Sequence, residues 1–155
     1  MPGGLSPDSN QARVPPNVKF EVDDAEEVWT FRENFDFVHS RYMAFSIQDW
    51  PRFIRQSYEH TAPGGFTEIQ DFMLDYYSED GSYHEGQAVH TWATTLLQAS
   101  RDFGRDPSPG IKLEQQFKDA GFENVVAQRF RLPIGPWAKD KHFVCGSNQS
   151  AAAHV

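Results

Sequence analysis

The chain has 155 residues, a length that fits one domain with a buried core. Its formal net charge of −8 argues against binding to nucleic acid, because no basic patch is present to displace counterions from phosphates. No apolar run approaches the length of a membrane span. The single cysteine, Cys145, excludes an internal disulfide, and with no signal-peptide pattern we expect an intracellular protein, cytoplasmic or nuclear.

The first third of the chain divides into a lead-in and two strand-like segments. Residues 1–16 are rich in Pro, Gly, Ser and Asn and predict a disordered lead-in. Residues 17–22 (NVKFEV) alternate polar and apolar side chains between turn-forming residues, which predicts a strand. A second strand is predicted at residues 35–39 (FDFVH). We therefore expect a partial domain over residues 17–140.

A helix and a third strand follow. Asp49 and Pro51 form a capping pattern with proline in the first turn, which predicts a helix over about residues 50–60. Pro63, Gly64 and Gly65 end this helix. The two glycines indicate a turn and not a phosphate cradle, because no helix begins behind them. The alternation of residues 65–74 predicts a strand that starts at this turn.

Two more helices and a last strand complete the predicted domain. Residues 87–103 carry apolar side chains at helical spacing, and Gly104 ends the pattern. A short helix is predicted over residues 112–120, with Gly121 as its cap. Residues 124–132 predict a strand.

This alternation of strands and helices predicts the α/β class, a sheet with covering helices. The low complexity of residues 141–155 predicts a disordered tail. The apolar positions of the later helices and the last strand are expected to share one core; they are Trp92, Leu96, Phe117, Phe122 and Val125.

An acidic pair follows the first predicted strand. Asp23 and Asp24, with Ala25 next to them, would lie just beyond the carboxyl end of that strand, where open α/β sheets bind their ligands. A carboxylate there could accept a hydrogen bond from an adenine amino group. The alternative is that Asp23 caps the next turn and that its neighbours are a solvated acidic stretch.

His39 and Arg41 lie at the end of the second predicted strand, the same kind of position. The imidazole of His39 could act as a general base near neutral pH, and the guanidinium of Arg41 could hold a carboxylate. The alternative is that Arg41 only ties down the following loop. The other histidines lack the spacing of a metal site, so no metal is expected.

Three segments in order resemble fungal class I S-adenosylmethionine-dependent methyltransferases. They are residues 14–29 (VPPNVKFEVDDAEEVW), 35–50 (FDFVHSRYMAFSIQDW) and 58–72 (YEHTAPGGFTEIQDF), and residues 117–137 (FKDAGFENVVAQRFRLPIGPW) extend the match. Within that family, the resemblance is to the velvet-complex regulator of secondary metabolism and its methyltransferase-domain relatives. It covers about residues 5–140.

The resemblance implies a Rossmann-like sheet and a site for S-adenosylmethionine. It implies that Asp23, Asp24 and Ala25 line the adenine end of the cofactor site. It also implies that His39 and Arg41 lie at the methionine end. The methyl acceptor, a small molecule or a protein, does not follow from the resemblance.

The chain also departs from the pattern of the family. Such enzymes begin with a strand and a Gly-x-Gly-x-Gly loop whose amides approach the cofactor, and no such loop precedes Val14. Gly4 stands where the family carries an acidic residue that grips the ribose. Beyond Trp137 the similarity ends. We therefore expect a methyltransferase sheet incomplete at both ends, with unpaired edges through which the chain associates with itself or a partner.

Three functions are compatible with this sequence. The first is a methyltransferase by descent that binds S-adenosylmethionine weakly because the glycine-rich loop is missing, with His39 as the candidate base. The second is a cofactor-free pericyclase or isomerase on the same scaffold. The third is a non-enzymatic remnant that binds a partner protein.

Overall fold

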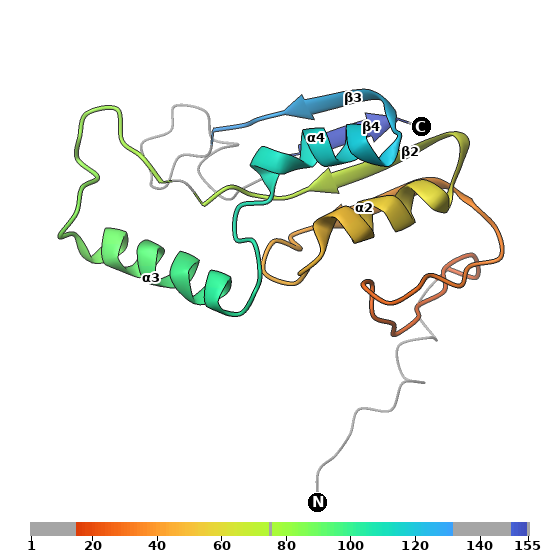
Figure 1. Ribbon diagram of the computed structural model, residues 1–155, viewed down its shortest axis with the longest axis horizontal. Coiled ribbons are helices and arrows are strands. Elements are labelled where there is room, and N and C mark those ends of the chain that lie inside the picture. The colour runs from red at the N-terminus through yellow and green to blue at the C-terminus, as the bar shows by residue number, and fades with distance from the viewer. Residues whose placement is uncertain (1–14, 75, 132–149, 155) are drawn as a thin grey trace, which may run out of the picture.

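The computed structural model describes residues 15–74, 76–131 and 150–154 (Figure 1). Within these ranges the chain forms three helices and four strands. In chain order they are β1 (Phe35–Arg41), α2 (Trp50–Glu59), β2 (Thr61–Gln70), α3 (Ala88–Asp102), α4 (Gly110–Ala120), β3 (Glu123–Gln128) and β4 (Ser150–His154).

The four strands form one mixed sheet in the order β1-β2-β4-β3. β1 and β2 are parallel and are joined through α2, whereas β4 runs antiparallel to both β2 and β3. α2 and α4 lie side by side against one face of the sheet (Figure 1). The α/β class predicted from the sequence is confirmed.

α2 begins where its capping residues predict. The carboxylate of Asp49 accepts a hydrogen bond from the backbone N–H of Arg52 at 3.0 Å, and Pro51 occupies the first turn. Trp50, Phe53 and Ile54 are buried on the side of the helix that faces the sheet. The capping residues therefore predict where α2 begins, and the apolar spacing predicts which side of it is buried.

The core lies between this sheet face and the two helices. Its buried members are Ile47, Trp50, Phe53, Ile54, Ile69, Leu113, Phe117 and Phe122. The prediction that Phe117 and Phe122 belong to the core is confirmed, and Val125 packs against it, partly buried. The prediction for Trp92 and Leu96 is wrong, because neither belongs to this cluster and the side chain of Trp92 is 56% exposed.

The position of α3 explains this difference. α3 stands away from the sheet, beyond the block formed by α2 and α4 (Figure 1). Only Ala93 and Ser100 of this helix are buried. The predicted helix is present, but its apolar stripe has no sheet face opposite it.

Two segments at the ends of the domain differ from the sequence prediction. Residues 17–22 were predicted to be a strand and form none; Phe20 is 72% exposed. An alternating pattern becomes a strand only where a neighbouring backbone accepts its hydrogen bonds, and no described strand lies beside this segment. Conversely, the predicted disordered tail contains β4, because Ser150–His154 fills the position between β2 and β3 and pairs on both sides. The remainder of residues 141–155 and nearly all of the lead-in lie outside the described residues.

Pro63, Gly64 and Gly65 lie within β2 and not in a turn before it. Phe35 pairs with Thr61 and Phe37 with Phe66, so β2 carries extra residues at this point. Gly64 has φ of 82°, and a Cβ on Gly65 would come within 3.0 Å of the Asp36 carbonyl oxygen. The glycines are therefore needed for a bulge that keeps β2 close to β1.

Candidate functional site

The parallel strands β1 and β2 have their carboxyl ends side by side at one end of the sheet, the place where α/β sheets bind ligands. Directly after β1, Tyr42 adopts a left-handed φ of 60°, which is unusual for a residue with a side chain. Its amide donates to the carbonyl oxygen of Gln70 at 3.0 Å. The chain therefore turns sharply at Tyr42 and presents its next amides to the end of β2.

Asp71 is a buried polar residue directly after β2, at these strand ends. Its carboxylate accepts hydrogen bonds from the backbone N–H of Met43 at 2.7 Å and of Phe72 at 2.9 Å. The residue is only 5% exposed. Burial raises the pKa of the Asp71 carboxyl, against the opposing effect of the backbone hydrogen bonds. Asp71 therefore holds the loop after β1 against the end of β2.

The sequence prediction missed Asp71 because it placed residues 65–74 in one strand. The sequence feature that could have identified Asp71 is a carboxylate at a position expected on the buried side of that strand. In β2, Thr67 and Ile69 are buried, and Asp71 continues their alternation. A charged residue on an apolar stripe indicates a backbone clamp or a site.

Arg41 ends β1 and lies beside aromatic rings. Its guanidinium is 5.0 Å from the centroid of the Tyr42 ring, and that ring is 5.6 Å from the ring of Phe72. The Arg41 side chain is exposed. An exposed guanidinium fixed over a ring can receive a carboxylate in a defined direction.

His39 lies within β1 and not in the loop beyond it. Its Nδ1 is 3.0 Å from Oε2 of Glu68 on β2, and its ring stacks on Phe37 with 5.8 Å between centroids. A carboxylate beside one ring nitrogen orients the imidazole. The His39 side chain of this pair is exposed to solvent.

The acidic pair lies in a separate turn. The carboxylate of Asp24 accepts from the N–H of Glu26 at 2.9 Å, and that of Asp23 accepts from the N–H of Asp24 at 2.9 Å. Ala25 accepts from the Trp29 indole at 2.9 Å. The structure thus makes Asp24 the principal cap of this turn, a role that the sequence alternative had given to Asp23.

Glu26 fixes this turn near the loop that follows β1. Its carboxylate accepts from the N–H of Gln48 at 2.9 Å and of Asp49 at 2.8 Å, directly before α2. The turn and the end of β1 therefore border the same loop. Among the described residues, no hydrogen bond or ion pair joins Asp23 or Asp24 to Arg41.

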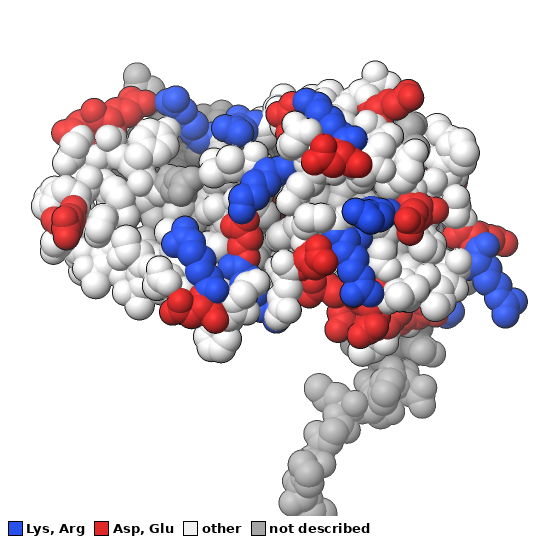
Figure 2. All heavy atoms as spheres, viewed as in Figure 1, with Lys and Arg blue, Asp and Glu red and all other residues white. Residues whose placement is uncertain are grey.

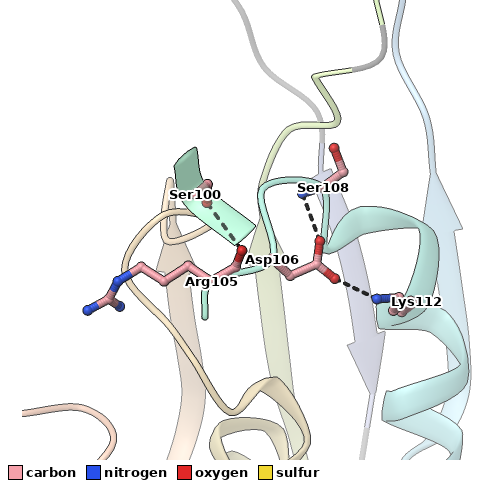
Figure 3. A network of polar contacts seen from close by, with 5 residues as sticks. All are labelled: Ser100, Arg105, Asp106, Ser108 and Lys112. Atoms are coloured by element: carbon pink, nitrogen blue, oxygen red, sulfur yellow. Dashed lines mark hydrogen bonds and ion pairs between the residues drawn. The ribbon is translucent and has the colours of Figure 1, made fainter. Parts of the chain in front are cut away.

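The connection between α3 and α4 reaches the same loop. Arg105 donates to the carbonyl oxygen of Ser46. Its own carbonyl accepts from Ser100 Oγ at 3.2 Å (Figure 3). Beside it, Asp106 accepts from Lys112 Nζ at 2.8 Å and from the Ser108 N–H at 3.0 Å. Burial acts to raise the pKa of Asp106, but these two hydrogen bonds keep it below its usual value.

The charge pattern and the placement of metal-ligating side chains add two observations about the described residues. Lys and Arg are interspersed with Asp and Glu on the face drawn in Figure 2. In the described ranges, no three His, Cys, Asp or Glu side chains are placed to hold a metal ion. None of the helices described is long and apolar enough to cross a membrane. Gly4 lies outside the described residues.

An open α/β sheet with polar side chains at the carboxyl ends of parallel strands is the architecture of a nucleotide-type cofactor-binding protein. Comparison with known protein families identifies the family within this class. The family model described as "Methyltransferase domain" matches residues 4–127, and the chain belongs to this family.

Fungal proteins are among the similar sequences. Methyltransferase pytC of Aspergillus terreus is 42% identical over 86% of this chain and 42% of its own length. The secondary metabolism regulator laeA of Aspergillus fumigatus is 29% identical over 77% of this chain and 32% of its own length. The resemblance stated from the sequence is therefore confirmed, and the chain spans less than half of these relatives.

Solved structures support the fold. A methyltransferase dependent on S-adenosylmethionine from Methanosarcina mazei superposes with a TM-score of 0.57 over 94% of this chain and 73% of that chain, at 14% identity. The fold is therefore that of the class I S-adenosylmethionine-dependent methyltransferases, as the sequence predicts.

Proposed function

We propose that this chain carries one part of an S-adenosylmethionine site, at the carboxyl ends of β1 and β2, and binds the cofactor only weakly by itself. The reaction is methyl transfer from the sulfonium to an oxygen, nitrogen or carbon nucleophile. The observation that carries the proposal is the loop after β1, clamped by Asp71 and bordered by both Arg41 and the acidic turn.

Each end of the cofactor has a candidate group in this arrangement. The Arg41 guanidinium, exposed and set over the Tyr42 ring, suits the carboxylate of the methionine moiety. Asp23 or Asp24 suits the adenine amino group, because both carboxylates are exposed beside the same loop. Ala25 packs its methyl group against the core and keeps the turn in place.

His39 is the candidate general base for the acceptor. Glu68 lies 3.0 Å from its Nδ1 and leaves Nε2 as the nitrogen that can face an acceptor. Most of the rate enhancement would come from aligning the acceptor with the sulfonium. The base is therefore needed only for acceptors that lose a proton during transfer.

Weak binding follows from the number of strong contacts that these residues can make. A hydrogen bond to a charged group contributes about 1.5–3 kcal/mol. The candidate groups named above include neither the amides of a glycine-rich loop nor a carboxylate for the ribose, and two such contacts would contribute about 3–6 kcal/mol in total. This corresponds to an affinity lower by about a hundred- to ten-thousandfold.

A titration with S-adenosylhomocysteine tests both parts of this proposal. In a chemical-shift titration of the purified chain, we expect saturation only at millimolar ligand. Arg41→Ala should weaken binding further, about tenfold or more. Arg55→Ala removes the same charge from the exposed side of α2 and should leave the titration unchanged. Micromolar one-to-one binding would contradict weak binding, and equal effects of the two substitutions would contradict the role of Arg41.

A further inference from the structure

The connection between α3 and α4, residues 103–109, contacts the segments that follow both parallel strands. The guanidinium of Arg105 donates to the backbone carbonyl of Ser46, in the loop after β1. Three residues later, the hydroxyl of Ser108 accepts from the backbone N–H of Leu74, in the segment after β2, at 3.3 Å. The connection is therefore bonded to both sides of the candidate site.

The end of α3 fixes the backbone of Arg105. The Arg105 N–H donates to the carbonyl oxygen of Ser100 at 3.0 Å, and its own carbonyl accepts from Ser100 Oγ at 3.2 Å. Gly104, with φ of 73°, makes the left-handed turn that brings these groups together. Ser100 is buried, although most of α3 is not. The last turn of α3 therefore sets the point from which the Arg105 side chain extends.

The residues after Arg105 hold the connection against α4. Asp106 accepts from Lys112 Nζ at 2.8 Å, and Figure 3 shows its side chain directed away from that of Arg105. Pro107 and Pro109 are fully buried. Because the ring of a proline fixes its φ, these two positions have little conformational freedom. With the backbone fixed on both sides, the Arg105 guanidinium is preorganised toward the loop after β1.

This loop, residues 42–49, is held at three points. Asp71 binds its start and Glu26 binds its end, through the backbone hydrogen bonds described above. Arg105 binds its middle with a charged donor, and such hydrogen bonds are stronger than those between neutral groups. The ring over which the Arg41 guanidinium lies belongs to the first residue of this loop. A displaced loop would therefore move that ring and redirect the guanidinium.

We propose that Arg105 is a positioning residue of the cofactor site, which holds the loop of residues 42–49 and thereby sets the direction of the Arg41 guanidinium. The inference rests on the proposed function, in which Arg41 receives the carboxylate of the methionine moiety. Arg105 acts through Arg41 and not by contact with the cofactor. α3, which contributes little to the core, then has a role, because its last turn anchors Arg105.

Amide exchange measured by NMR tests the anchoring without any ligand. Arg105→Met removes the guanidinium and keeps an aliphatic stem. Exchange at residues 42–47 should become about tenfold faster, the ratio for one hydrogen bond to a charged group, while the amides of α4 keep their rates. Arg101→Met, on the exposed last turn of α3, is the matched control and should change neither. Unchanged rates in Arg105→Met, or an equal rise in α4 or in the control, would overturn the proposal.

A double-substitution cycle with S-adenosylhomocysteine tests the path through Arg41. Arg105→Met should weaken binding about tenfold. Arg105→Lys should restore most of the affinity, because its ammonium can still donate to the Ser46 carbonyl. Adding Arg105→Met to Arg41→Ala should cause no further loss, since both changes act on one guanidinium.

The outcomes separate this inference from the proposed function. A further loss of about tenfold in the double variant would overturn the role of Arg105, because the two residues would then act independently. No saturable binding by the unaltered chain would instead refute the proposed function. The exchange rates would still decide in that case whether Arg105 holds the loop.

Discussion

α3 and α4 are both amphipathic, yet only α4 buries its apolar side. Leu113 and Phe117 of α4 are each 1% exposed, while Val89 and Trp92 of α3 are 46% and 56% exposed. α4 lies on the sheet beside α2, whereas α3 stands off from both (Figure 1). An apolar stripe therefore marks the side of a helix that can be buried, and the fold decides whether anything covers it.

The largest loss of stability is expected in α4, the helix whose apolar side is buried. Phe117→Ala removes a fully buried ring whose centroid is 4.8 Å from that of Phe122, and it should lower the free energy of unfolding by about 3–5 kcal/mol. Urea unfolding followed by circular dichroism measures this change. Ile111→Ala on the same helix, at a position 53% exposed, should cost far less. Similar losses for the two variants would show that burial of Phe117 against the sheet does not stabilise the fold more than an exposed position of α4 does.

An intermediate effect is expected at Asp71, between the core and the candidate site. Because burial raises its pKa in the folded state, the folded chain binds the proton more tightly than the unfolded chain does. Its contribution to stability is therefore fully present below the unfolded pKa, about 4, and is lost as pH rises through the higher folded value.

Asp71→Asn removes this titration. The stability of the unaltered chain relative to Asp71→Asn should fall as pH rises through that window, by about 1.4 kcal/mol for each unit of pKa difference. Denaturant midpoints measured across pH 3 to 7, a span of about four units around this window, give the curve. A parallel pH dependence for the two proteins would show that Asp71 is not the titrating group.

The smallest effect is expected on the exposed side of α3. Trp92 lines a shallow, open depression with Leu96, and its ring centroid is 6.4 Å from that of Tyr76. Because more than half of the side chain is already exposed, Trp92→Ala should cost about 1 kcal/mol. The same urea experiment compares it with Phe117→Ala. A loss as large as that of Phe117→Ala would mean that something covers this side of α3.

Local patterns predicted elements well where the neighbouring backbone is present. The cap at Asp49 and the glycine at position 121, with φ of 107°, bound α2 and α4 as expected. Residues 17–22 have an equally good strand pattern and form no strand. The physical reason is that helices satisfy their hydrogen bonds within one segment, whereas a strand depends on another strand that its own pattern does not specify.

For the candidate site, the sequence alone placed His39 and Arg41 at the end of a strand, and they lie there in β1. It also placed Asp23 and Asp24 beyond a strand at residues 17–22, and that strand does not form. The tertiary structure decided what each of them meets. It brought Glu68 to His39 and added Asp71 as the clamp. Glu68 lies in β2 and Asp71 directly follows it, and β2 is distant from β1 in the chain but adjacent in the sheet. Side-chain type and order are local properties of the sequence, whereas burial and pairing arise only when the parallel register aligns β1 with β2.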